Sequence, residues 1–119
     1  KIMKNKLKNY SIDYNSTLNQ AIKKIETNTY KTLVVTKKNK IIGILSEGDI
    51  IRAIYKNINY ISPIKNHMTT DFKFVNKNSE TEKVLRYYKK YNITIIPVCD
   101  KKFNLKEIIL IPEIIKLKI

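Results

Sequence analysis

The side chains best suited to recognise a ligand lie close together in the stretch IIGILSEGDIIRAI, residues 41–54. Ser46 supplies a hydroxyl, Asp49 a carboxylate, and Arg52 a guanidinium one turn further along. The pattern predicts an apolar strand that ends here and a helix that begins. A helix start offers backbone N–H groups and positive potential to an anion, so this stretch suits a polar, anionic ligand.

The same residues also have a purely structural interpretation. Ser46 and Asp49 are spaced as a capping box, in which the hydroxyl bonds the amide three residues later and the acidic side chain reaches back. Such a cap needs no ligand. From the local sequence, capping and ligand binding both stay open, and one geometry could serve both.

The chain has few residues that could support metal binding or catalysis. His67 is the only histidine, which leaves no His-based metal cluster and fits a solvated linker position. Glu47 and Asp49 are too few carboxylates for a magnesium site, so we expect no catalytic residue, no metal ligand and no cofactor. Cys99 is the only cysteine, which excludes an internal disulfide and fits a reducing, cytoplasmic location. We expect Cys99 to be a core residue.

The net charge of +14 raises the question of a nucleic-acid or membrane partner. The lysines are scattered singly or in pairs, and only Arg52 and Arg86 are arginines, the side chain best suited to bidentate phosphate contacts. No apolar run approaches the length of a membrane span. We therefore expect neither a membrane nor a nucleic-acid partner, although a basic surface favours anionic small molecules such as nucleotides.

The chain repeats one weak pattern twice. A shift of 63 residues places Ile12 on Val75, and a shift of 64 places Asp49 on Glu113. Each copy predicts a β-α-β-β-α unit, which makes the fold class α+β. Because three strands with helices on one face cannot close a core alone, the two units should pack sheet to sheet with pseudo-twofold symmetry, leaving a groove between them.

Local signals predict where the elements and their boundaries lie. Ser16 is expected to cap the first helix, and Ser79 to begin a capping box before a helix in the second unit. The expected hairpin strands are residues 32–36 with 40–45 and 93–99 with 105–111, and the helices that follow them are residues 48–57 and 112–117. The predicted divisions are residues 1–58 for the first repeat, 59–71 for a Pro63-containing linker with a short helical turn, and 72–119 for the second repeat.

Two of these stretches resemble the tandem CBS domain pair. Residues 41–54 are similar to the family's hallmark, an apolar strand ending in Gly-apolar-apolar-Thr/Ser-x-x-Asp before a helix. The sequence IIPVCD, residues 95–100, is similar to the family's apolar-Pro-Val-apolar-Asp strand. The two repeats cover nearly the whole chain, from about Ser11 to Ile115.

This resemblance implies an adenosine-type nucleotide as the regulatory ligand. The family's ribose-binding Asp matches Asp49, and its hydroxyl residue near the phosphates matches Ser46. The base would be enclosed by residues around the first two strands. The full set of ligand-binding residues expected in this way is Ile12, Thr32, Leu33, Ser46, Glu47, Asp49 and Arg52.

The second repeat departs from the pattern. Leu110 and Glu113 occupy the positions of Ser46 and Asp49, and Pro112 removes one N–H from the helix start. Leu110 offers no hydroxyl, and Glu113 is one methylene longer than Asp. We therefore expect one functional site, governed by the first repeat.

The resemblance also predicts what the fragment does. It implies a regulatory nucleotide-binding and homodimerisation module of a larger enzyme, with no activity of its own. Residues 46–75 resemble CBS pairs that precede sugar-phosphate nucleotidyltransferases of surface-glycan biosynthesis, and sugar-phosphate isomerases carry similar pairs. The alternative is a structural dimerisation scaffold without a ligand.

Overall fold

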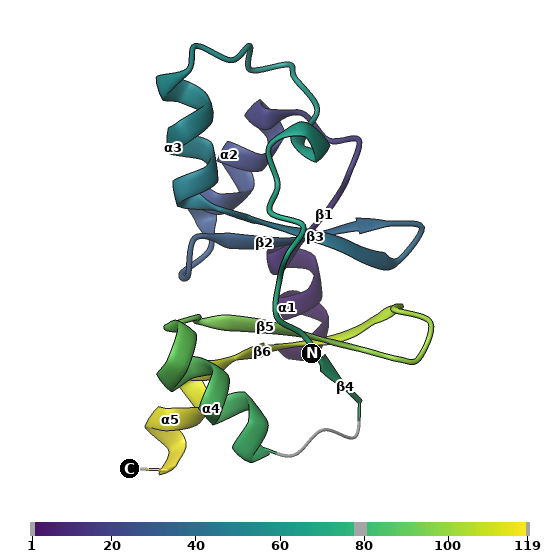
Figure 1. Ribbon diagram of the computed structural model, residues 1–119, viewed down its shortest axis with the longest axis vertical. Helices are drawn as coiled ribbons and strands as arrows, with labels where there is room; N and C mark the ends of the chain where they lie inside the picture. The colour runs from purple at the N-terminus through teal and green to yellow at the C-terminus, as the bar shows by residue number, and fades with distance from the viewer. Residues whose placement is uncertain (1, 78–80, 119) are drawn as a thin grey trace.

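The computed structural model describes residues 2–77 and 81–118, which form two stacked units (Figure 1). Each unit has a three-stranded sheet whose outer face is covered by two helices, and the two sheets face one another. This confirms the predicted α+β fold of two units packed sheet to sheet. The elements are α1 (Ile2–Tyr10), β1 (Ser11–Asp13), α2 (Leu18–Thr27), β2 (Thr32–Lys37), β3 (Lys40–Ser46), α3 (Glu47–Tyr55), η1 (Ile64–Asn66), β4 (Val75–Asn76), α4 (Thr81–Tyr91), β5 (Ile95–Cys99), β6 (Leu105–Leu110) and α5 (Ile111–Lys118).

The two sheets share one topology and one register. In each sheet the first two strands are parallel and the last two form an antiparallel hairpin. Ile12 pairs with Val35 in the first sheet, and Val75 pairs with Val98 in the second, which is the register that the 63-residue shift predicts. The hairpin register also shifts at the same place, directly after Val35 and Val98. The repeat inferred from the sequence is therefore a structural repeat.

The buried apolar residues form three clusters that correspond to the layers of the fold. One lies between α2, α3 and the first sheet, and another between α4, α5 and the second sheet. The middle cluster joins the sheets, with Val34 and Ile41 from the first and Ile95 and Ile108 from the second. Each unit therefore has a core of its own, and each sheet buries its inner face against the other.

The helix α1 is an element that the sequence did not predict. Leu7 and Tyr10 belong to the cluster between the sheets, and the Tyr10 hydroxyl accepts a hydrogen bond from the Thr29 amide (3.1 Å). The helix contacts β2 of its own unit and β6 of the other unit. Its sequence is rich in lysine and has no acidic residue in its first turn, so the usual helix signals are weak.

One predicted cap differs from the structure. Helix α2 is capped by Thr17 and not by Ser16, because only Thr17 has a glutamine three residues later, Gln20, that completes a capping box. The predicted Ser79 cap lies outside the described residues. The predicted short helical turn in the linker is confirmed as η1.

The linker of the structure, residues 56–74 between α3 and β4, packs tightly on the first unit. Ile44 and Thr69 exchange two backbone hydrogen bonds of 2.9 and 2.8 Å, so the linker runs along the edge of β3. Gly43 makes this approach feasible, since a Cβ atom there would lie 2.5 Å from Met68 Sδ and 3.1 Å from the Thr69 carbonyl oxygen. The glycine of the predicted motif is therefore required by the linker.

We predict that Gly43→Ala lowers the free energy of unfolding by about 1–3 kcal/mol, because the added methyl overpacks the linker contact. Gly48→Ala is the matched control: its Cβ would lie 3.5 Å from Arg52 Nη1, an ordinary contact inside helix α3. That variant should be neutral or stabilise the protein by up to about 1 kcal/mol. Chemical denaturation measures both, and equal effects would contradict the role given to Gly43.

Candidate functional site

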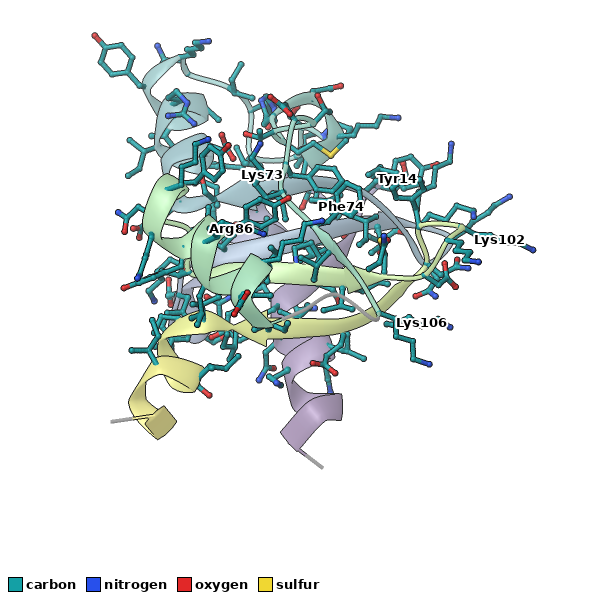
Figure 2. The ribbon with its side chains drawn as sticks, turned by 60° about the horizontal axis from the view of Figure 1, so that its bottom comes forward. Tyr14, Lys73, Phe74, Arg86, Lys102 and Lys106 are labelled. Carbon is teal, nitrogen blue, oxygen red and sulfur yellow. The ribbon has the colours of Figure 1, made fainter. Side chains whose placement is uncertain are left out.

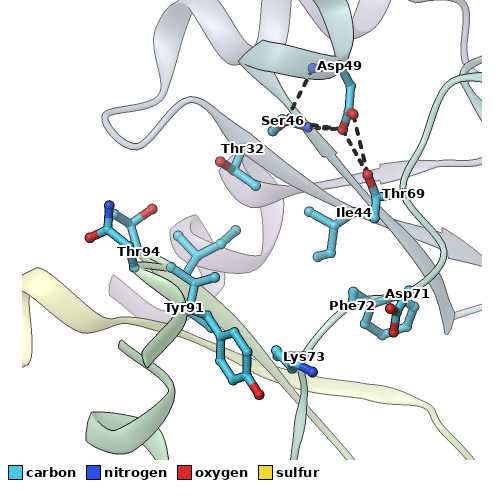
Figure 3. A pocket seen from close by; sticks show the side chains of 13 residues that line it. Thr32, Ile44, Ser46, Asp49, Thr69, Asp71, Phe72, Lys73, Tyr91 and Thr94 are labelled. Carbon is cyan, nitrogen blue, oxygen red and sulfur yellow. Dashed lines mark hydrogen bonds between the residues drawn. The ribbon is translucent and has the colours of Figure 1, made fainter. Parts of the chain in front are cut away.

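A cavity of about 510 Å³ opens between the two units, where α3 begins and α4 ends (Figure 3). Its volume falls within the range of small-molecule sites. Both units and the linker contribute to its walls. The lining residues are Thr32, Ile44, Ser46, Asp49, Thr69, Asp71, Phe72, Lys73, Tyr91, Asn92, Ile93, Thr94 and Ile95.

Backbone geometry brings the two halves of this lining together. Thr32 and Ser46 are paired at the open end of the first hairpin, where β3 passes into α3. In the second unit, Asn92 adopts a left-handed conformation (φ 54°), which ends α4 and turns the chain toward β5. Thr94 then lies across the cavity from Thr32 (Figure 3), and Ile95 begins β5.

The carboxylate of Asp49 is the most heavily bonded group in the pocket. Oδ2 accepts from the Ser46 amide (2.9 Å) and the Ser46 hydroxyl (3.1 Å), and Oδ1 accepts from Arg52 Nη2 (2.6 Å). The Thr69 hydroxyl lies 3.3 and 3.4 Å from the two oxygens. Asp49 is 7% exposed, so these partners replace water around a buried charge.

The capping role that the sequence left open is confirmed. The Asp49 amide donates to Ser46 Oγ (3.2 Å), which completes the box. The Glu47 amide donates to the Lys31 carbonyl oxygen (3.0 Å). The expectation that the start of α3 offers free N–H groups is therefore wrong for these two amides, because the cap and a neighbouring loop already use them.

Three of the seven predicted ligand residues line the cavity, namely Thr32, Ser46 and Asp49. Ile12 and Leu33 are buried in the cluster on the opposite, helix-covered face of the first sheet. Successive strand residues point to opposite faces, so Leu33 cannot share the direction of Thr32. Whether any of these residues contacts a ligand stays a prediction.

The other two predicted residues point away from the cavity lining. Glu47 is exposed and borders a smaller hollow of about 270 Å³ between α2 and α3. The side chain of Arg52 is 66% exposed and reaches back to Asp49. Arg52 therefore contacts the pocket only through the carboxylate that it pairs with.

Several lining residues were missed by sequence reasoning. Phe72 and Lys73 lie on the linker, and Thr94 lies in the loop after α4. Tyr91 is 43% exposed and lines the cavity at the end of α4. The Lys73 ammonium lies 4.5 Å from the centre of the Tyr91 ring, which joins the linker to the second unit.

The internal repeat relates this cavity to a second place, beside Leu110 at the start of α5. Side chains occupy that second place. Leu110, at the position of Ser46, is buried, and Tyr10 and Tyr30 pack against the same cluster with ring centres 6.3 Å apart. The Tyr30 hydroxyl donates to Glu113 Oε2 (3.4 Å). Burial, followed by the nearby Glu113 carboxylate, raises the pKa of Tyr30, which keeps the hydroxyl protonated as a donor.

Cys99 and His67 are two further candidate reactive groups, and the surroundings of both suit a structural role. Cys99 is fully buried, as predicted, and burial, together with the adjacent Asp100 carboxylate, raises the pKa of its thiol, which disfavours the reactive thiolate. His67 is half-buried, with Nε2 3.0 Å from Ser62 Oγ, instead of fully solvated.

Over residues 2–77 and 81–118, no group of three or more His, Cys, Asp or Glu side chains is placed to hold a metal ion. No helix in these ranges has the length and apolar character needed to cross a bilayer.

Comparison with known proteins agrees with this geometry. Residues 1–56 match the family model of the CBS domain. The match covers 56 of the 119 residues, so the first unit is similar to a CBS domain. The second half repeats its topology and register, so the whole chain has the fold of a tandem CBS pair.

Two curated proteins resemble the chain in sequence. An uncharacterised 17.7 kDa protein from Acidianus ambivalens is 32% identical over 77 residues, which is 64% of this chain and 46% of that protein. A homoserine O-acetyltransferase from Methanobrevibacter ruminantium is 29% identical over 105 residues, 87% of this chain and 21% of the enzyme. The chain thus spans less than half the length of these relatives.

Solved structures of low sequence identity share the fold. A Methanocaldococcus jannaschii protein described as an archaeal homologue of γ-AMPK has a TM-score of 0.80 at 17% identity, covering 90% of this chain and 45% of that one. A Pyrobaculum aerophilum CBS domain protein complexed with AMP has 0.74 at 18%, covering 87% and 81%. The cytosolic domain of the Mg²⁺ channel MgtE in complex with ATP has 0.75 at 19%, covering 92% and 45%.

We predict that Asp49→Ala destabilises the ligand-free protein by about 1–3 kcal/mol, because it removes the reciprocal half of the capping box and leaves the Ser46 amide and the Thr69 hydroxyl without their acceptor. Arg52→Ala should cost less than about 1 kcal/mol, since that side chain is largely solvated. Urea unfolding measures both. A larger loss in Arg52→Ala than in Asp49→Ala would show that the ion pair, and not the cap, holds this corner together.

Proposed function

We propose that this chain is a regulatory module that binds an adenine nucleotide in the cavity between its two units. The observation that carries the proposal is the make-up of that cavity. Hydroxyl and carboxylate groups from the first unit and the linker face aromatic and apolar side chains from the linker and the second unit. This combination suits a ligand with one flat apolar part and one polar part.

The lining suggests how such a ligand lies. Ile44, Phe72 and Tyr91 provide apolar and aromatic surface for the base. Asp49 can accept from the ribose hydroxyls once the Thr69 hydroxyl, at 3.3 and 3.4 Å, moves aside. Ser46 completes the polar side of the site.

The remaining predicted residues support the site indirectly in this proposal. Thr32 offers a hydroxyl at the cavity edge. Ile12 and Leu33 fix the strands behind it, Arg52 holds the Asp49 carboxylate in place, and Glu47 begins the helix that carries Asp49. Support for the ligand class comes from the fold neighbour that is complexed with AMP.

Regulation follows from the position of the cavity. A ligand there touches both units and the linker, so it can favour one arrangement of these parts through its differential affinity for them. An attached catalytic domain would respond to that arrangement. We propose that the parent protein is a sugar-phosphate nucleotidyltransferase, with a sugar-phosphate isomerase as the alternative. We further propose that it is cytoplasmic.

The outer face of α3 supports the proposed homodimer. Ile51, Ile54 and Tyr55 are 59%, 44% and 87% exposed, and together they make an apolar surface beside the smaller hollow. Contiguous apolar surface of this kind marks interaction sites. Association of two copies through their α3 helices would bury it.

A ligand-free dimerisation scaffold is the second candidate. The observation that favours it is the Asp49 carboxylate, whose oxygens already accept bonds from Ser46, Arg52 and Thr69. A ligand must compete with these partners. Dimerisation without any nucleotide-induced shift in melting temperature would establish this alternative.

We predict that AMP binds with a stoichiometry of one per chain, because side chains fill the second, repeat-related place. Tyr91→Ala should weaken binding roughly 5- to 100-fold, the loss expected when a base loses its stacking partner. Tyr60→Ala is the matched control, since Tyr60 is 53% exposed and lies outside the cavity lining. Isothermal titration calorimetry measures all three proteins, and unchanged affinity in Tyr91→Ala would remove the cavity as the binding site.

A further inference from the structure

We infer that the cavity selects adenine nucleosides carrying at most one phosphate over nucleoside triphosphates. This inference rests on the proposed function and specifies the ligand of the same site. The fold neighbours do not decide the question, because one is complexed with AMP and another with ATP. The charges and hydrogen-bond donors of this cavity bear on it directly.

The cavity lining carries little positive charge, although the chain as a whole has a net charge of +14. Lys73 is the one cationic residue among the lining residues, and Asp49 and Asp71 are its acidic ones. Arg52 neutralises Asp49 through the 2.6 Å ion pair. Lining and paired charges therefore balance, with one ammonium available for a phosphate.

The backbone adds few donors to this single ammonium. Helix starts usually bind phosphates through their free N–H groups. Here the amide of Glu47 donates to the Lys31 carbonyl oxygen and the amide of Asp49 to Ser46 Oγ. A triphosphate would therefore place most of its charge in solvent or near the exposed Asp71 carboxylate.

Outside the lining, the Lys90 ammonium lies 5.4 Å from the centre of the Tyr91 ring and can add a second, more solvated positive charge at the cavity mouth. The lysines of the hairpin tips lie elsewhere. Figure 2 shows Lys102 and Lys106 together on the hairpin of β5 and β6, apart from Lys73. Lys40 Nζ donates to the Lys102 carbonyl oxygen (2.7 Å), and Lys106 Nζ lies 3.9 Å from Asp100 Oδ2, so these contacts hold the ammonium groups of Lys40 and Lys106 at the hairpin tips. At physiological salt the Debye length is about 8 Å, so local charges outweigh the distant ones.

Calorimetry with adenosine, AMP, ADP and ATP, in magnesium-free buffer at physiological salt, tests the inference. We expect adenosine and AMP to bind within about tenfold of one another and ATP to bind at least about tenfold more weakly than AMP, a difference of about 1.4 kcal/mol. ATP binding as tightly as AMP, or more tightly, overturns the inference while the proposed function stands. Binding of none of the four overturns both.

Two variants identify the groups responsible. Asp71→Asn should strengthen ATP binding by roughly 3- to 10-fold and leave adenosine unchanged, because it removes repulsion of the outer phosphates. Lys73→Gln should weaken AMP, but not adenosine, by a similar factor. Lys65→Gln is the matched control, since the Lys65 ammonium also lies over an aromatic ring, 5.5 Å from Tyr14, but outside the cavity lining. Equal effects of Lys73→Gln and Lys65→Gln, or no change of ATP affinity in Asp71→Asn, would contradict the assignment.

Discussion

The buried carboxylate of Asp49 fixes the corner of the molecule on which the candidate site depends. It bonds the last strand residue, Ser46, the guanidinium of Arg52 on the same helix, and the hydroxyl of Thr69 on the linker. A charge 7% exposed is stable only with such partners, so the strand end, the helix start and the linker hold one another in place. Gly43 contributes the space that lets the linker come this close. In the proposed function, a ligand that takes over part of this carboxylate would loosen the linker.

The second constraint is the shared core between the sheets. Because each sheet buries its inner face against the other, the loop after α4 is held opposite the end of the first hairpin, and the cavity forms between them. The internal symmetry would allow two such cavities. The segments that precede the two units break it: the linker leaves space beside Ser46, whereas α1 brings Tyr10 to the corresponding place beside Leu110. One site in a duplicated fold thus follows from two different lead-in segments, in addition to the loss of the hydroxyl at Leu110.

The sequence predicted those parts of the structure that depend on periodicity and on the spacing of residues. The repeat shift that aligns Ile12 with Val75 also gives the observed strand register, and the Ser46–Asp49 spacing gives the observed cap. The cavity walls from the linker and the second unit could not be predicted, because Lys73 meets Tyr91 through tertiary packing between residues that share no local pattern. Helix α1 was missed because its sequence lacks the usual signals of a helix start, such as an acidic residue in the first turn. The sequence-based ligand set grouped Leu33 with Thr32, whereas the alternation of side chains along the strand puts Leu33 in the helix-covered cluster.

In the proposed function, this module senses a nucleotide in one cavity, at the start of α3. Backbone amide chemical shifts of isotope-labelled protein titrated with AMP test it residue by residue. The account predicts saturable shifts for Thr32, Thr69 and Thr94, with smaller changes at Tyr30 and Glu113 in the filled place. Saturable shifts centred on Tyr30 and Glu113 while the cavity residues stay unchanged would contradict it.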